Sequence, residues 1–198
     1  MKDEWTRPLF GDLRPTEPQG EGAGDGGTGD GPFRHGPGGV EWSRGRYAVS
    51  TDPDRLDIPA TATFLASTPW ARDISEPIVR RSIEGSIGFG LYEGAEQIGF
   101  ARVVTDRATF AWVGDVFVLE AHRGLGLGLW LMECILAHPD LRELRRWMLA
   151  STTARGLYAR LGFSPISAPE RFMEIADPGV HSRQKARRQG EATNEDPG

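Results

Sequence analysis

The sequence is poor in cysteine. Cys134 is the sole cysteine of the 198 residues, so no disulfide can form within the chain. Because structural disulfides are typical of oxidising compartments, this scarcity predicts a reducing, cytoplasmic location. Cys134 lies in an apolar stretch, and we expect it to be a small buried hydrophobe rather than a reactive thiol.

Long apolar runs and an excess of positive charge are also missing. No run approaches the ~20 residues of a membrane-spanning helix, and the N-terminus lacks the apolar core of a signal peptide. The formal net charge is −5, whereas nucleic-acid binding needs a basic face. We therefore expect a soluble protein with neither a membrane nor a nucleic-acid partner.

Aliphatic residues are scarce at both ends of the chain. Residues 1–40 are rich in glycine, proline and charge, which predicts a disordered leader that cannot bury enough apolar surface to fold. Residues 177–198 are expected to form a polar C-terminal tail, whose basic residues are assigned to solvation. This division leaves residues 41–176 as one folded domain.

Hydrophobic periodicity and turn residues predict the order β-α-α-β-β-β-α-β-α-β-β within that domain. The predicted strands cover residues 46–51, 87–92, 97–104, 110–119, 147–150, 163–166 and 171–175. The predicted helices cover residues 57–67, capped by Asp57, then 76–83, capped by Ser75 or Asp73, 129–136 and 153–161. Three consecutive strands form an antiparallel meander, and a helical crossover makes strand 147–150 parallel to strand 110–119.

A glycine-rich loop follows strand 110–119 and opens the next helix. A loop of this kind at a helix N-terminus favours an anion, because the first N–H groups of the helix have no partner within it. Gly124, Gly126 and Gly128 allow the backbone to approach a ligand closely. Arg123 places a guanidinium at the mouth of the loop, where it can meet a phosphate.

Two common phosphate-binding motifs do not fit this loop. The P-loop requires Gly-Lys-Ser/Thr, which is missing. The dinucleotide fingerprint requires a third glycine one residue later and an acidic residue at the end of the next strand. Glu143 falls before that strand, so a dinucleotide-dependent enzyme is the third hypothesis.

The spacing that fits is Arg-x-x-Gly-x-Gly at Arg123, Gly126 and Gly128. A second motif, Ala-x-x-Leu-Tyr-x-x-x-Gly-Phe, runs from Ala154 to Phe163. In this order the two motifs resemble those of the GCN5-related N-acetyltransferases (GNAT). The resemblance implies an α/β fold with a mixed, mostly antiparallel sheet, a splayed central parallel strand pair and flanking helices. It also implies an acetyl-CoA-dependent N-acetyltransferase acting on a primary amine by direct attack. The alternative is a non-catalytic acyl-CoA-binding or regulatory module.

The resemblance also assigns residues to the acetyl-CoA site. The pyrophosphate lies on the loop, and the pantetheine arm bonds to the main chain of the strand before it. Tyr158 protonates the departing sulfur, with packing under acetyl-CoA as the alternative. The expected acetyl-CoA-binding residues are Val116, Phe117, Val118, Arg123, Gly124, Leu125, Gly126, Leu127, Gly128 and Ser151, the last of which replaces the asparagine found in many members.

The acceptor side is less clearly specified. Asp115 is the first candidate for the general base and Glu84 the second, although Asp115 can equally brace a neighbouring strand. Trp70, Phe89 and Trp112 are candidate walls of the acceptor pocket, with core packing as the alternative for each. The expected acceptor is a small amine or the amine of a peptide. No metal is expected, and a homodimer is left open.

Overall fold

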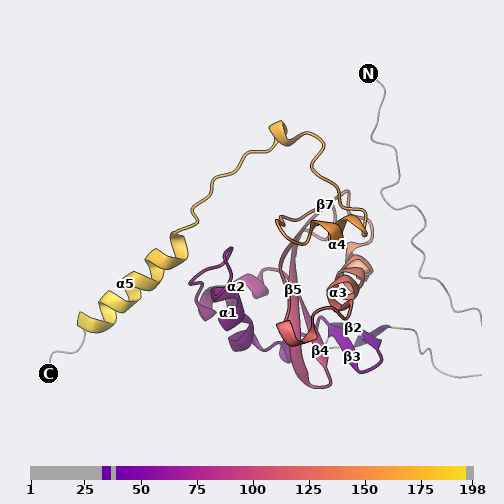
Figure 1. Ribbon diagram of the computed structural model, residues 1–198, viewed down its shortest axis with the longest axis horizontal. Helices are drawn as coiled ribbons and strands as arrows, with labels where there is room; N and C mark the ends of the chain where they lie inside the picture. The colour runs from indigo at the N-terminus through magenta and orange to yellow at the C-terminus, as the bar shows by residue number, and fades with distance from the viewer. Residues whose placement is uncertain (1–32, 37–38, 195–198) are drawn as a thin grey trace, which may run out of the picture.

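The computed structural model describes residues 33–36 and 39–194. They form one mixed sheet, with α1 and α2 on one side and α3 on the other (Figure 1). The strands are β1 (Phe33–Gly36), β2 (Gly39–Arg44), β3 (Tyr47–Ser50), β4 (Ile87–Glu93), β5 (Glu96–Thr105), β6 (Phe110–Val118) and β7 (Arg146–Met148). The α-helices are α1 (Ile58–Ala66), α2 (Glu76–Glu84), α3 (Leu127–Leu136), α4 (Arg155–Ala159) and α5 (Val180–Asn194). Short 3-10 helices are η1 (Pro53–Arg55), η2 (Glu120–His122), η3 (Pro139–Leu141) and η4 (Pro169–Arg171).

The strands lie in the sheet in chain order, from β1 to β7. Every neighbouring pair is antiparallel except β6 and β7, which are parallel and joined through α3. The predicted meander and the predicted parallel pair are therefore confirmed. The fold class expected from the sequence, a mostly antiparallel sheet flanked by helices, is also confirmed.

Each face of the sheet has its own apolar core. On the α3 side, the helix buries Leu131 and Ile135 against residues of the central strands such as Phe89 and Val113. On the other side, α1 and α2 bury Leu65 and Val79, among others, with Phe100 and Phe117 of the sheet. Alternate residues of β5 and β6 therefore point to opposite helices, as the two-residue period of a strand requires.

Helix α1 is fixed to the sheet through its first turn. The Asp57 side chain accepts a hydrogen bond from the Ala60 N–H at 2.8 Å, so the predicted N-cap is confirmed. Gln97 of β5 accepts from the Asp57 N–H at 2.9 Å and donates to the Thr61 hydroxyl at 2.9 Å. The amide oxygen and the amide nitrogen of Gln97 thus both fix the position of the first turn of α1 over the sheet.

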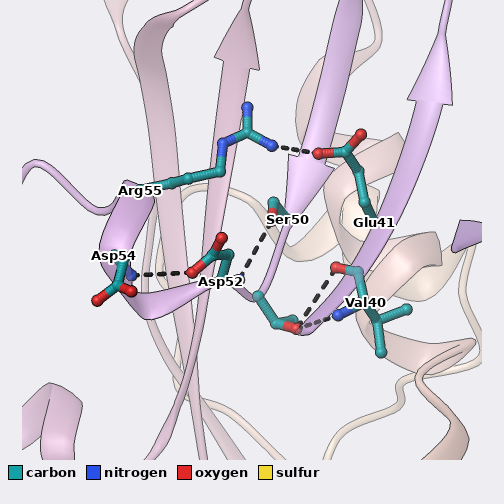
Figure 2. A network of polar contacts seen from close by, with 7 residues as sticks. Val40, Glu41, Ser50, Asp52, Asp54 and Arg55 are labelled. Atoms are coloured by element: carbon teal, nitrogen blue, oxygen red, sulfur yellow. Dashed lines mark hydrogen bonds and ion pairs between the residues drawn. The ribbon is translucent and has the colours of Figure 1, made fainter. Parts of the chain in front are cut away.

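A polar network holds β2 against the turn that follows β3 (Figure 2). The Val40 N–H donates to the Thr51 hydroxyl at 2.8 Å, and Arg55 pairs with Glu41. In the turn itself, the Asp52 N–H donates to the Ser50 hydroxyl at 3.1 Å. The first half of the sheet is therefore tied to the segment that leads into α1.

The sheet begins before the boundary expected at residue 41. Strand β1 pairs with β2 in an antiparallel hairpin, so residues 33–36 and 39–40 belong to the sheet and not to the predicted leader. The composition was misleading because Gly36 and Gly39, which suggested an unfolded leader, are paired residues of two strands. The rest of the predicted leader, residues 1–32 and 37–38, lies outside the described residues.

The two last predicted strands, 163–166 and 171–175, are wrong. The segment holds only η4 and irregular backbone, and the side chains of Met173 and Ile175 are 98% and 105% exposed. Near the end of the segment, Arg146 of β7 lies over the Phe172 ring at 5.5 Å, and the chain then continues to α5 beyond α1 and α2 (Figure 1). Phe172 thus meets β7 through its side chain, and no described residue of the segment pairs with β7 as a strand.

The predicted polar tail contains α5, a helix that the composition did not suggest. Cys134 is 2% exposed and burial raises the pKa of its thiol, which confirms its role as a buried hydrophobe. No helix within residues 33–36 and 39–194 is both long and apolar enough to cross a membrane.

Candidate active site

The glycine-rich loop ends at the N-terminus of α3. Gly124 and Gly126 have φ values of 78° and 74°, which only glycine adopts without strain. Gly126 is the N-cap residue, so α3 starts at Leu127, two residues before the predicted start. No side chain of the described residues caps this helix, which leaves its first N–H groups free for an anion.

A cavity of about 520 Å3 lies at this helix N-terminus. It is lined by the end of β6, the loop, the start of α3 and one face of α4. Predicted residues in the lining are Val118, Arg123, Gly124, Gly126, Leu127 and Gly128. Leu125, the remaining predicted residue of the loop, is 54% exposed and outside this lining.

The cavity also contains residues that the sequence reasoning missed, namely His122, Leu129, Gly156, Leu157 and Arg160. Leu157 of α4 and Arg160, the residue that caps its C-terminus, are three positions apart and share a face, while Tyr158 between them belongs to the core. The exposed face of the predicted helix 153–161 was the signal for them. With Arg123, whose Nε donates to the Val118 carbonyl at 2.9 Å, the cavity has two guanidinium groups suited to phosphate.

The main chain of β6 is open on the side of β7. The two strands pair only from Phe110 to Trp112 on β6, although β6 continues to Val118. Among the described residues, no other strand bonds to that side. An extended ligand can therefore bond, between the diverging strands, to those main-chain groups from Val116 to Val118 that face the gap, whereas the Val118 carbonyl already accepts from Arg123 Nε.

A β-bulge interrupts β6 at the same place. Arg102 of β5 is opposite Gly114, whereas Phe100 is opposite Phe117, so two residues of β6 face one residue of β5. Asp115 in this bulge has a φ of 55°, an unusual value for a residue other than glycine. Phe117 itself stacks on Phe64 at 3.8 Å, so its side chain serves the core, and its main chain is opposite Phe100 of β5.

Asp115 is the centre of a polar cluster on the α1 and α2 side of the sheet. Its carboxylate accepts from Arg102 Nε at 2.5 Å and from the Trp70 indole Nε1 at 3.3 Å. The Asp115 side chain is 12% exposed, whereas Trp70 is 59% exposed. The structure therefore brings together two predicted acceptor-side residues and adds Arg102, whose charge within an otherwise apolar strand was the signal for it.

The other predicted acceptor-side residues are more scattered. Trp112 is half-buried and is opposite Val104 of β5. The next pair but one is Gly114 and Arg102, so the Trp112 side chain lies on the same face of the sheet as that of Arg102. Phe89 is fully buried under α3, where it packs against Trp42 at 6.3 Å, so it does not lie with Trp70. Glu84 is the last residue of α2 and is exposed.

Tyr158 is on α4 next to Leu157 of the cavity lining, but it belongs to the buried core cluster and is 9% exposed. Its ring meets Phe163 edge-on at 6.0 Å. Burial raises the pKa of the Tyr158 hydroxyl, so the hydroxyl stays protonated and can donate a hydrogen bond. Ser151 accepts from the Ala154 N–H at 3.1 Å and so shapes the turn that leads into α4.

The comparisons with known proteins agree with this geometry. Residues 84–165 match the model of the acetyltransferase (GNAT) domain. An inferred GNAT-family acetyltransferase from Xanthomonas campestris pv. campestris is 48% identical, with a TM-score of 0.67, and the match covers 69% of this chain and 96% of that structure. An inferred acetyltransferase of Gibberella zeae is 34% identical over 140 residues, which are 60% of this chain and 79% of that protein.

A more distant structure, from Deinococcus radiodurans, shares the fold with a TM-score of 0.56 at 19% identity and covers 70% of this chain and 93% of that one. The matched region contains both motifs, the cavity and the diverging strands. The chain therefore belongs to the GNAT family of acetyltransferases.

Proposed function

We propose that the protein transfers the acetyl group of acetyl-CoA to an amine in a ternary complex. The observation that carries the proposal is the cavity at the N-terminus of α3, which meets the open main chain of β6 at Val118. One end of this site suits a pyrophosphate and the other an extended amide chain, which are the two parts of coenzyme A. A Clostridium acetobutylicum protein that shares the fold, with a TM-score of 0.50 at 13% identity, was crystallised with acetyl-CoA.

The anionic end is held by main-chain N–H groups and by two cations. The first turn of α3 offers N–H groups with no partner within the helix, next to the left-handed Gly126. Arg123 and Arg160 bring positive charge from opposite walls of the cavity. These contacts fix the pyrophosphate, which directs the pantetheine arm along β6.

The reacting end is placed beside the bulge of β6. A main-chain N–H of Val116, Phe117 or Val118 polarises the thioester carbonyl and stabilises the oxyanion that forms on attack. Tyr158, whose hydroxyl stays protonated because burial raises its pKa, donates a hydrogen bond or its proton to the departing sulfur.

The acceptor approaches from the α1 and α2 side, where Trp70 is exposed. Asp115 accepts the proton of the attacking ammonium, directly or through water, while Arg102 and Trp70 hold its carboxylate in place. Trp70 and Trp112 present apolar surface to the body of the amine. The acceptor is therefore a primary amine on a small molecule or a peptide.

The test is an acceptor screen that follows the release of free thiol from acetyl-CoA. The panel contains tyramine, spermidine, glucosamine and a short peptide with a free N-terminus. We expect at least one amine to raise thiol release well above the acceptor-free rate, with the acetylated amine seen by mass spectrometry. Binding of acetyl-CoA with no acetylated product from any amine would instead favour a non-catalytic acyl-CoA-binding module.

A further inference from the structure

Helix α5 is bonded to the loop between α1 and α2, residues 67–75. The Ser182 hydroxyl donates to Asp73 Oδ2 at 2.8 Å, and Lys185 Nζ pairs with Asp73 Oδ1 at 2.7 Å. One turn further along α5, Arg188 donates to the Ser75 hydroxyl at 3.1 Å. Residues at this spacing share one face of a helix, so a single face of α5 meets the loop.

Asp73 lies in a left-handed turn of the loop, and its carboxylate is bonded to α5. Its φ is 63°, in the left-handed region that costs free energy for residues other than glycine. Its N–H bonds to the Ala66 carbonyl at 3.2 Å, which closes the loop back onto the end of α1. The hydrogen bonds from Lys185 and Ser182 lower the pKa of the Asp73 carboxyl, so both of its oxygens are engaged as an anion.

The contact extends beyond these bonds. A groove of about 340 Å3 lies between α5 and the loop, with Ile74 and Ile78 on one side and His181, Gln184 and Arg188 on the other. Figure 1 shows α5 at the end of a long connection, beyond α1 and α2 as seen from the sheet. The C-terminal helix therefore contacts the domain at this loop.

The sequence of α5 explains why this contact is polar. The helix carries several arginines and glutamines and has no apolar stripe that could pack on the domain. An isolated helix of this length is only marginally stable in water. Formation of α5 and its binding to the loop are thus coupled, and salt that screens the Lys185–Asp73 pair weakens both.

The same loop carries Trp70, whose indole donates to Asp115 in the candidate acceptor site. We propose that Asp73, bound by α5, is a positioning residue that holds the Trp70 loop in place for the acceptor. This inference rests on the proposed function, because it assigns Trp70 to the acceptor side. The cavity at α3 shares no residue with α5 or the loop, so acetyl-CoA binding is independent of Asp73.

The first measurement is amide hydrogen exchange of residues 67–75 in the full chain. Lys185→Met removes the ion pair, and Asp73→Gly removes the carboxylate while glycine keeps the positive φ without strain. Both changes are expected to speed exchange in the loop. Lys185→Arg keeps the positive charge, so exchange in the loop should stay as slow as in the wild type.

Arg187→Met is the matched control, since it removes the same charge from the same helix at an exposed residue outside the groove. It should leave exchange of the loop at the wild-type rate. Equal exchange in Lys185→Met and Arg187→Met would overturn the inference.

The second measurement is kinetic and uses the amine of the panel with the highest turnover. Asp73→Gly and Lys185→Met should raise the KM of that amine about 3- to 10-fold, as expected when a loop is held by a few exposed polar contacts. The KM of acetyl-CoA should not change. A looser loop with an unchanged amine KM would also refute the positioning role. Failure of the proposed function has a different signature, because the wild type would then turn over no amine at all.

Discussion

Gly126→Val is expected to lower the affinity for acetyl-CoA by about 10- to 100-fold. A branched side chain at a φ of 74° forces the backbone out of the left-handed conformation that ends the loop. The N–H groups of the first α3 turn then no longer converge on the pyrophosphate. Loss of hydrogen bonds to a charged group costs about 1.5–3 kcal/mol, and ~1.4 kcal/mol corresponds to tenfold in affinity. Titration calorimetry with acetyl-CoA measures the change.

The chain offers a matched control for Gly126→Val. Gly94, in the turn between β4 and β5, has a φ of 60°, and a Cβ at either glycine would meet no atom within 4 Å. Gly94→Val therefore introduces similar backbone strain at a turn outside the cavity, and its affinity for acetyl-CoA should equal that of the wild type. Equal affinities in both valine variants would show that the loop is not the binding site.

Tyr158→Phe is expected to lower kcat by about 100-fold, at the low end of the usual contribution of general acid catalysis. The substitution keeps the ring that packs on Phe163 and removes only the hydroxyl. Because that hydroxyl acts on the departing sulfur, its effect belongs to the transition state, and the KM of acetyl-CoA should hardly change. The measurement is steady-state turnover of the best amine of the panel, beside calorimetry for acetyl-CoA.

Tyr92→Phe is the control for loss of a buried hydroxyl. Tyr92 is 1% exposed, burial raises its pKa to about 12, and its hydroxyl has no hydrogen-bond partner among the described residues. Removing that hydroxyl should leave kcat unchanged and should not lower stability, since no bond is lost. A kcat of Tyr158→Phe equal to that of Tyr92→Phe would make Tyr158 a packing residue.

The sequence predicted the elements whose signals are local. Asp57 caps α1 as its position before an apolar helix suggested, and the meander follows from turn residues between alternating strands. The glycine loop was predicted at the N-terminus of α3 because the left-handed positions at Gly124 and Gly126 require glycine. These features depend on a few neighbouring residues, which a sequence displays directly.

Other elements depended on contacts between distant parts of the chain. Segment 171–175 alternates like a strand, yet its Met173 and Ile175 are exposed to solvent, and the chain continues to α5, which bonds to the α1–α2 loop. Helix α5 forms from a polar sequence through partners such as Asp73, more than 100 positions away. The hairpin of β1 and β2 was obscured by the glycines around it.

Some residues of the candidate site have local signals in the sequence, whereas others depend on contacts between distant segments. The loop was predicted because a motif marks it, and the main chain of Val116, Phe117 and Val118 was inferred from the family resemblance, whereas Arg160 and Arg102 were recognised only from the packing of α4 and β5. Phe89 shows the opposite case, since an aromatic residue in a strand gives no sign of which face of the sheet it will join. Its fully buried place beneath α3 was set by the register of β4 with β5.

The most direct test of the central claim is the thermal unfolding of the wild-type chain with three ligands in turn. A ligand that binds only the folded state raises the melting temperature, by an amount set by its concentration and affinity. We expect acetyl-CoA to raise the melting temperature, and NAD and ATP at the same concentration to leave it unchanged. A shift with NAD and none with acetyl-CoA would contradict the assignment of the α3 cavity to acetyl-CoA.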